Sequence, residues 1–303
     1  MAAASARFDT TLRSEGRSLT VEEAARALET YDAIIPTLGD AFNAEAFARA
    51  DDMRCKVLAN VGVGYNHIDI GAAQAAGVLV SNTPGVVTDA TADIAMTLIL
   101  STCRRAGEGE RLVRRGEWTG WTPTQLLGQH VTGKTVGIVG MGRIGQAIAR
   151  RCRHGFDMRV LYFNRSEKDL PFSAIRVAKL TDLMARADIV VVAVPGGAAT
   201  RHLVDAAALA AMRPNGIFVN IARGDVVDEE ALIAALQEGR IAGAGLDVYE
   251  KEPLVPEALK AMENVTLLPH LGTAALEVRE AMGQMALNNV IAWSEGMALP
   301  QAV

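Results

Sequence analysis

Residues 134–150, KTVGIVGMGRIGQAIAR, decide the fold of this chain because they combine a strand, a turn and a helix in one short stretch. A run of β-branched and small residues leads into three glycines with the spacing GxGxxG, and apolar residues at helical spacing follow. Gly140 permits a sharp turn, Gly142 lets the backbone approach a pyrophosphate, and Gly145 lets the helix pack against the strand. The helix N-terminus then offers N–H groups to the phosphates. The segment therefore predicts a dinucleotide-binding unit.

The next strand indicates which dinucleotide is bound. Residues 158–163, MRVLYF, form this strand and are followed by Asn164, Arg165 and Ser166. An NAD site usually has Asp or Glu here, about 20 residues beyond the glycines, to bind the ribose 2′-hydroxyl. Hydrogen-bond donors and a cation instead suit a 2′-phosphate. We therefore expect NADP in preference to NAD; the alternative is that Arg165 is an ordinary solvated cation.

Composition favours a cytoplasmic protein of about two domains. The chain has 303 residues, of which 50% are hydrophobic and 21% charged, so it can form a packed core. Its net charge of −5 argues against nucleic-acid binding, and the arginines of residues 104–115 are interleaved with glutamates as on a solvated helix face. No apolar run reaches the roughly 18 residues of a membrane helix, and the N-terminus lacks the apolar core of a signal peptide. Cys55, Cys103 and Cys152 indicate free thiols in a reducing compartment, and no metal site is expected.

Short strands alternate with amphipathic helices along most of the chain, which predicts parallel sheets covered by helices on both faces. The fold class is therefore α/β, with two doubly wound parallel-sheet domains: a flavodoxin-like substrate domain and a Rossmann cofactor domain. Residues 1–99 begin the substrate domain, residues 100–272 form the cofactor domain, and residues 273–303 return to the first. Thr181 and Asp228 are each expected to cap a helix.

Polar side chains follow three predicted strands of the cofactor domain. Arg223 follows GIFVNIA, Asp247, Glu250 and Glu252 follow IAGAGL, and His270 follows VTLL. Each residue alone has an ordinary structural explanation, since loop arginines and glutamates are usually solvated. Ligands, however, bind at the carboxyl ends of parallel strands. Together the residues predict a site made of an arginine, carboxylates and a histidine.

Long motifs in the chain resemble one family of dehydrogenases. GMGRIGQAIA, NIARGDVVDEEALIAALQEGRIAGAGLDVYEKEP and LLPHLGT look like the D-isomer-specific 2-hydroxyacid dehydrogenases. Within that family, VGVGYNHIDI, WTPTQLLG and the turn at Asn164 are most similar to glyoxylate/hydroxypyruvate reductases. The match runs from about Thr20 to the C-terminus. It implies NADPH-dependent reduction of a small 2-keto acid to the 2-hydroxy acid, as the D-isomer where the product is chiral.

The resemblance also implies roles for individual residues. Arg223 would bind the substrate carboxylate and polarise the keto oxygen, His270 would be the general acid, and Glu252 would hold the imidazole and favour its protonated form. The backbone N–H groups of Val63 and Gly64 would face the substrate. The residues expected to bind the cofactor are Gly140, Gly142, Arg143, Ile144, Gly145, Asn164, Arg165, Ser166, Val194, Pro195, Gly196, Thr200, Ile221, Ala222, Asp247 and Thr91.

A homodimer through the cofactor domains is a further expectation from the resemblance, with Trp121 reaching the substrate site of the neighbouring subunit. Two features depart from the family pattern. The family opens with a strand and a helix before the segment that resembles RFDTTLRSEGRSLTVEEA, whereas only MAAASA precedes it here, so the first domain is expected to be shortened. His67 stands where the family often has Asn, and we interpret it as a tolerated loop residue.

Two other functions occur on the same fold. Formate dehydrogenases pair the histidine with Gln because no proton moves, so Glu252 argues against that activity. A dinucleotide-sensing corepressor keeps the Arg, Glu and His set and is therefore not excluded by these residues. Such a protein usually carries an extended tail, whereas this chain ends at Val303, soon after its last predicted helix.

Overall fold

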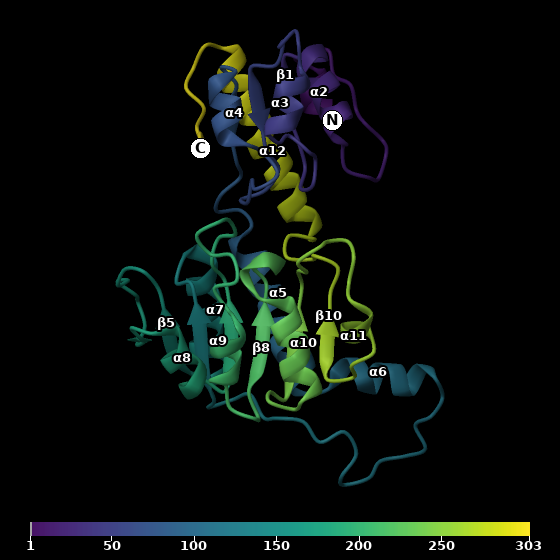
Figure 1. Ribbon diagram of the computed structural model, residues 1–303, viewed down its shortest axis with the longest axis vertical. Coiled ribbons are helices and arrows are strands. Elements are labelled where there is room, and N and C mark those ends of the chain that lie inside the picture. The colour runs from purple at the N-terminus through teal and green to yellow at the C-terminus, as the bar shows by residue number, and fades with distance from the viewer. Residues whose placement is uncertain (1) are drawn as a thin grey trace. The chain divides into compact units, whose positions relative to one another are not determined.

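The strand of the glycine-turn segment is an inner strand of a seven-stranded parallel sheet in the computed structural model, which describes residues 2–303 (Figure 1). The strand order β10-β9-β8-β7-β4-β5-β6 reverses direction at β4, which pairs with β5 on one side and β7 on the other. Ligands bind at such a switch point in open parallel sheets. The strands are β4 (Thr135–Val139), β5 (Arg159–Phe163), β6 (Ile175–Arg176), β7 (Ile189–Val192), β8 (Ile217–Asn220), β9 (Gly243–Leu246) and β10 (Val265–Leu267).

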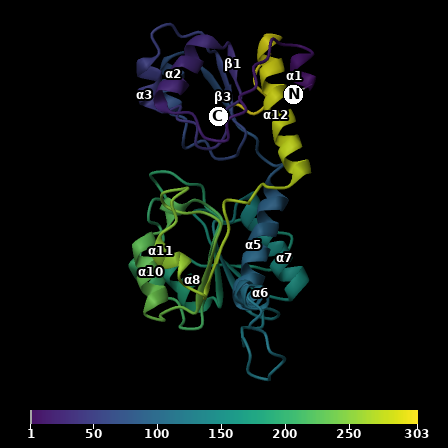
Figure 2. The same cartoon turned by 90° about the vertical axis from the view of Figure 1, so that its right-hand side faces the viewer.

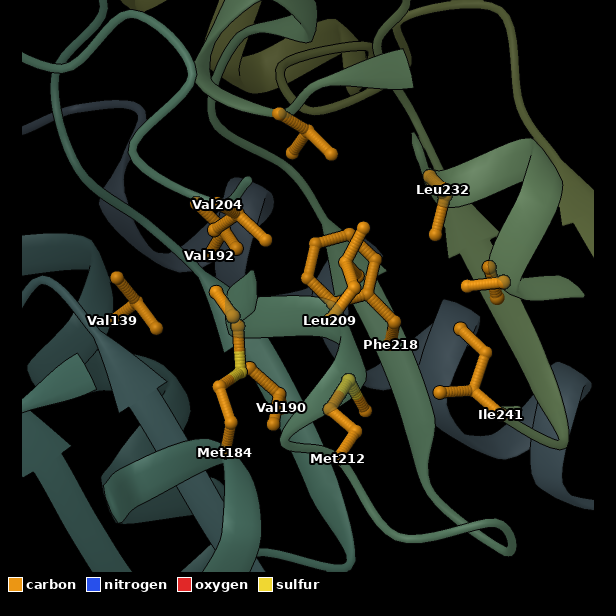
Figure 3. Packing of buried hydrophobic residues seen from close by; sticks show 14 of the residues in the cluster. Val139, Met184, Val190, Val192, Val204, Leu209, Met212, Phe218, Leu232 and Ile241 are labelled. Atoms are coloured by element: carbon orange, nitrogen blue, oxygen red, sulfur yellow. The ribbon is translucent and has the colours of Figure 1, made fainter. Parts of the chain in front are cut away.

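Helices cover both faces of this sheet, as the alternation in sequence predicts. Figure 2 shows α5 and α7 on one side and α8 and α10 on the other. The strand residues divide accordingly: Ile189 and Val191 pack with α5 and α7, whereas Val190 and Val192 pack with the opposite helices (Figure 3). The helices are α5 (Thr88–Cys103), α6 (Ala106–Arg114), α7 (Arg143–Phe156), α8 (Leu180–Arg186), α9 (Ala206–Ala210), α10 (Glu229–Gln237) and α11 (Glu257–Lys260).

The chain divides into two compact units, one of which is interrupted by the other. The larger unit is Thr88–Ala274, and the smaller contains the described residues up to Val87 together with Ala275–Val303. The first boundary thus precedes α5, whereas the sequence analysis placed it at residue 99, inside this helix. The reason is packing, since Ala95 and Ile99 of α5 lie in one core with Ile138 of β4.

The smaller unit has a three-stranded parallel sheet in the order β1-β2-β3. Leu58 of β2 packs with α2, α3 and α4, while Val57 and Ala59 face the other way and pack against Ala286 and Val290 of α12. The last helix therefore completes a unit that the first 87 residues begin. Its elements are α1 (Ala2–Ser5), α2 (Val21–Thr30), β1 (Ala33–Ile34), α3 (Ala44–Arg49), β2 (Val57–Ala59), α4 (Ile70–Ala75), β3 (Leu79–Ser81) and α12 (Leu276–Ser294).

Two expected helix caps have different outcomes. Asp228 caps α10, where its side chain accepts a hydrogen bond from the Ala231 N–H at 3.0 Å. The expected cap at Thr181 is wrong, because α8 begins one residue earlier, at Leu180, with Lys179 as N-cap. None of the helices in residues 2–303 combines the length and the apolar character that crossing a membrane requires.

Candidate active site

The loops that follow β8, β9 and β10 meet at one edge of the sheet because these strands are neighbours in it. Arg223, Glu252 and His270 come from these three loops in turn. The structure joins Glu252 to His270 directly, since His270 Nδ1 lies 2.7 Å from Glu252 Oε2. Both side chains are partly accessible, at 32% for Glu252 and 26% for His270. The ring is therefore held in place and still open to a small molecule.

The hydrogen bonds of Glu252 settle which nitrogen of His270 is available. Glu252 Oε1 accepts a hydrogen bond from the Tyr249 N–H at 3.1 Å, so both carboxylate oxygens are engaged. Burial raises the pKa of Glu252, but the hydrogen bond and charge of His270, the Tyr249 N–H and the charge of Arg223 outweigh it, and the net pKa is lowered. An ionised carboxylate only accepts, so Nδ1 carries a proton. Nε2 has no hydrogen-bond partner within residues 2–303.

Asp247 fixes the backbone on which His270 stands. Its carboxylate is 1% exposed and accepts hydrogen bonds from the N–H groups of Leu271 (2.6 Å) and Gly272 (2.8 Å). Burial raises the pKa of Asp247, although these N–H groups and the charge of His270 oppose the rise. His270 has a left-handed backbone (φ 55°), and its N–H donates to the Asp247 carbonyl at 2.9 Å. Such non-glycine conformations persist where surrounding contacts impose them.

Arg223 is placed by a buried asparagine that the sequence analysis did not single out. Asn220 is 2% exposed and stands at the end of β8; its Nδ2 donates to the Arg223 carbonyl, and its Oδ1 accepts from the Ala222 N–H, both at 3.0 Å. The Arg223 guanidinium donates to the Ala222 carbonyl at 2.7 Å. Burial lowers the pKa of Arg223, while Glu252 and Asp225 raise it. An asparagine at the end of an apolar strand was the available signal in the sequence.

Gly224 brings the Arg223 loop against the Glu252 loop. A Cβ on Gly224 would lie 1.9 Å from the Tyr249 carbonyl carbon, so no side chain fits between the two backbones. Tyr249 is 6% exposed, and its hydroxyl donates to the Leu268 carbonyl at 2.9 Å, which ties the same loop to the one after β10. Sequence reasoning also missed these two residues.

Glu250 does not join the His270 cluster, although the sequence analysis grouped it with the other carboxylates. Its Oε1 accepts from Arg201 Nη2 and lies at the same distance, 3.2 Å, from His202 Nε2. The Glu250 N–H donates to Glu229 at 3.2 Å. Glu250 therefore ties its loop to residues 201–202, just beyond Thr200 in the loop that follows β7.

The glycine loop fits a dinucleotide, and its three glycines are required for different reasons. A Cβ on Gly145 would lie 2.0 Å from the Gly140 carbonyl oxygen, and Gly140 has φ +101°. The packing of the protein itself therefore requires these two glycines. A Cβ on Gly142 would meet nothing within 4 Å. Gly142 is the N-cap of α7 and has no side chain to bond the first N–H groups, so this open space suits a phosphate.

The turn after β5 is joined to the glycine loop. Asn164 Oδ1 accepts from the Met141 N–H at 3.2 Å, and Asn164 Nδ2 donates to the Ser166 carbonyl at 2.8 Å. Arg165 is exposed, and its guanidinium has no hydrogen bond or ion pair within residues 2–303. The other expected cofactor residues lie in the same unit, in or beside the loops that follow β4, β7 and β8, with Asp247 in the loop after β9 and Thr91 beside Gly272.

Val63 and Gly64 lie in the smaller unit, in the loop that follows β2. The Asn60 amide donates to the carbonyls of Gly62 and Gly64, each at 3.1 Å, and the Asn82 amide donates to the Val63 carbonyl at 2.9 Å. The carbonyls are thus engaged by side chains, whereas the N–H groups of Val63 and Gly64 have no acceptor among residues 2–303. Successive unpaired N–H groups form a site for an anion such as a carboxylate.

Comparisons with known proteins show the family to which the chain belongs. Residues 96–272 match the model of the D-isomer specific 2-hydroxyacid dehydrogenase NAD-binding domain. The chain is 42% identical over 302 residues to a glyoxylate reductase of Pyrococcus furiosus, covering 98% of this chain and 89% of that protein. Among solved structures, it is similar to a putative D-isomer specific 2-hydroxyacid dehydrogenase from Polaromonas, with a TM-score of 0.92, 37% identity and coverage of 100% and 95% of the two chains.

A second similar structure contains ligands. It is an NADPH-dependent glyoxylate/hydroxypyruvate reductase from Sinorhizobium meliloti in complex with NADP and malonate, with a TM-score of 0.84, 37% identity and coverage of 91% of this chain and 85% of that one. A Rossmann domain with a glycine loop of this kind binds a dinucleotide, and the matched domain model assigns it to the dehydrogenases. The chain belongs to the D-isomer-specific 2-hydroxyacid dehydrogenase family. It is thus an NAD(P)-dependent enzyme that reduces a 2-keto acid.

Proposed function

We propose that the enzyme reduces glyoxylate or hydroxypyruvate with NADPH, and that His270 donates the proton. The observation that carries this proposal is the environment of the His270 ring: Nδ1 is 2.7 Å from Glu252 Oε2, and Nε2 has no partner in the described chain. A protonated ring in that position donates from Nε2 to a substrate oxygen, and the Glu252 carboxylate stabilises the positive charge of the ring. An enzyme that transfers no proton does not need a carboxylate beside the histidine, so Glu252 supports proton donation by His270.

The other residues of the site divide the work of binding and orientation. Arg223 binds the substrate carboxylate and polarises the keto oxygen, since a guanidinium suits planar oxygen pairs. In the smaller unit, the N–H groups of Val63 and Gly64 are suited to bind a carboxylate. When bound, NADPH supplies a hydride from C4 of the nicotinamide to the keto carbon. His270 gives its Nε2 proton to the carbonyl oxygen, so one hydride and one proton convert the carbonyl group to an alcohol.

The preference for NADPH rests on the turn at residues 164–166. The turn holds no carboxylate that would bind a 2′-hydroxyl and repel a 2′-phosphate, and the Arg165 guanidinium is exposed with no protein partner. A charge-assisted hydrogen bond contributes about 1.5–3 kcal/mol, which corresponds to roughly 10- to 150-fold in affinity. Arg165 therefore accounts for a preference of that order.

Initial rates with glyoxylate test this proposal, using NADPH and NADH in parallel on the wild type and on Arg165→Ala. We expect the wild type to favour NADPH, and the variant to lose about tenfold or more in kcat/KM with NADPH while its rate with NADH changes little. Turnover that favours NADH would contradict the cofactor assignment. Unchanged NADPH absorbance with glyoxylate and hydroxypyruvate would contradict the substrate assignment.

We also propose a homodimer in which Trp121 contributes to the neighbouring site. The segment after α6 supports this because its large apolar side chains are exposed, with Trp118 at 54% and Trp121 at 80%. Exposed apolar patches of this kind mark interaction surfaces. Light scattering that returns the mass of a single chain at micromolar concentration would contradict the dimer, and wild-type kinetics in Trp121→Ala would contradict the role of Trp121.

A further inference from the structure

The turn at residues 164–166 is held from outside by an arginine on the neighbouring edge strand. Arg176 lies on β6, opposite Tyr162 of β5 in the pairing register. Its Nη2 donates to the Arg165 carbonyl at 2.9 Å and to the Asn164 carbonyl at 3.2 Å, and its Nε lies 3.4 Å from the latter oxygen. One guanidinium thus covers two consecutive carbonyl oxygens of the turn.

Covering these oxygens changes what the turn offers to a ligand. A backbone carbonyl carries partial negative charge and would repel a phosphate, whereas a carbonyl bonded to a cation is neutralised and turned toward it. The turn is also fixed at two other points. Asn164 bonds the glycine loop through the Met141 N–H, and the Lys168 N–H donates to the Tyr162 hydroxyl at 3.2 Å. Arg176 thus adds a third fixed point to the backbone of the turn, on which the Arg165 side chain is exposed.

The charged side chains in and beside the turn form no ion pairs with one another. Three cations, Arg165, Lys168 and Arg176, lie with two carboxylates, Glu167 and Asp169, in or beside the turn. None of these five side chains takes part in an ion pair within residues 2–303, so the carboxylates do not neutralise the cations by direct contact. The net balance is one positive charge, beside a helix N-terminus that already favours anions.

We infer that Arg176 is a specificity-determining residue, which positions the 164–166 turn to receive the 2′-phosphate of NADPH and adds positive charge to that subsite. This inference rests on the proposed NADPH dependence. It assigns Arg176 a positioning role, exerted through Asn164 and Arg165. A residue that only stabilised the sheet edge would affect ligands with and without the 2′-phosphate equally.

Calorimetric titration with two fragments separates these roles without any turnover. Adenosine 2′,5′-bisphosphate carries the 2′-phosphate, and adenosine 5′-monophosphate lacks it. In Arg176→Ala, we expect the Kd for the bisphosphate to rise about tenfold, while the Kd for the monophosphate changes less than about twofold. Arg176→Lys keeps the charge but cannot fork across two carbonyls, so we expect an intermediate Kd.

Arg159→Ala is the matched control, because Arg159 is an exposed arginine at the opposite end of β5. It removes the same charge and is expected to leave both Kd values unchanged. Equal weakening of both fragments in Arg176→Ala, or no weakening of either, would overturn the inference. The proposed NADPH dependence is tested separately by the wild type: equal affinity of the wild type for the two fragments contradicts NADPH selectivity, whatever the variants do.

Discussion

The two proposed ligand-binding ends of the larger unit are built differently. The loops after β8, β9 and β10 are held by buried polar groups, with Asn220 at 2% exposed and Asp247 at 1%, and by backbones that touch at Gly224. The turn after β5 instead relies on Arg165 and Arg176, which are exposed. Chemistry needs reacting groups fixed within tenths of an ångström, whereas discrimination between two cofactors needs only a charge in the right place. Substitutions at the first end are therefore expected to have larger effects than substitutions at the second.

Removing the proton donor is expected to produce the largest effect. His270→Ala deletes the proposed donor, so kcat/KM for glyoxylate should fall about 10²- to 10⁴-fold. NADPH binding, measured by quenching of protein fluorescence, should change little because the dinucleotide loop is untouched. His130→Ala removes an exposed histidine that lies outside the proposed site, so this control variant should keep its activity. A loss below threefold in His270→Ala would remove the distinction between the two ends.

Filling the contact between loops should have the next largest effect. Gly224→Ala places a methyl group 1.9 Å from a backbone carbon of Tyr249, so one of the two loops has to move. Overpacking of this kind costs about 1–3 kcal/mol of stability, and displacement of Arg223 from Glu252 should lower kcat/KM as well. Thermal unfolding and kinetics measure the two effects. Gly155→Ala in α7, where a Cβ meets nothing within 4 Å, should be neutral or stabilising; equal behaviour of the two variants would contradict the argument.

The smallest effect is a difference in how two carboxylates of one site respond to pH. The folded pKa of Glu252 is lowered, so its contribution to stability is present above its unfolded value, about 4.3, and is lost as pH falls through the folded pKa. The folded pKa of Asp247 is raised, so the wild type loses stability as pH rises from about 3.9 through the folded pKa.

Urea unfolding between pH 3.5 and 7 of the wild type, Glu252→Gln and Asp247→Asn measures this difference. The free energy of unfolding of the wild type relative to Glu252→Gln should rise with pH, and that relative to Asp247→Asn should fall. Slopes of the same sign for both variants would show that the surroundings of Glu252 and Asp247 do not shift their pKa values in opposite directions.

The parts of the fold that rest on local patterns were predictable from the sequence. The strand, turn and helix around Gly140 were predicted because hydrophobic runs and glycine spacing are local signals. In contrast, β6 was missed because Ile175 and Arg176 are both exposed and form a strand of only two residues. The domain boundary was placed inside α5 because an apolar helical stripe does not reveal which core it enters.

For the site, residue types were readable but their contacts were not. Arg223, Glu252 and His270 could be selected because they follow strand ends and match a family pattern. Asn220 supports Arg223 through contacts only two and three residues away, and an asparagine at the end of an apolar strand was a signal for it. Gly224 acts through its contact with Tyr249, in a loop 25 residues further along, and no local signal distinguishes it from an ordinary turn residue. Glu250 shows the converse, since its sequence position next to Glu252 did not indicate that it bonds Arg201 instead.

The interrupted smaller unit has a consequence for the order in which the protein is made. Domains fold as units as the chain leaves the ribosome. The first 87 residues emerge early, but the face of β2 that presents Val57 and Ala59 finds its partners, Ala286 and Val290, only when the end of the chain is translated. The larger unit is complete in sequence by Ala274. In a nascent chain, the larger unit can therefore fold before α12 has been translated. Until then the face of β2 with Val57 and Ala59 is uncovered, and a chaperone has an apolar surface to bind.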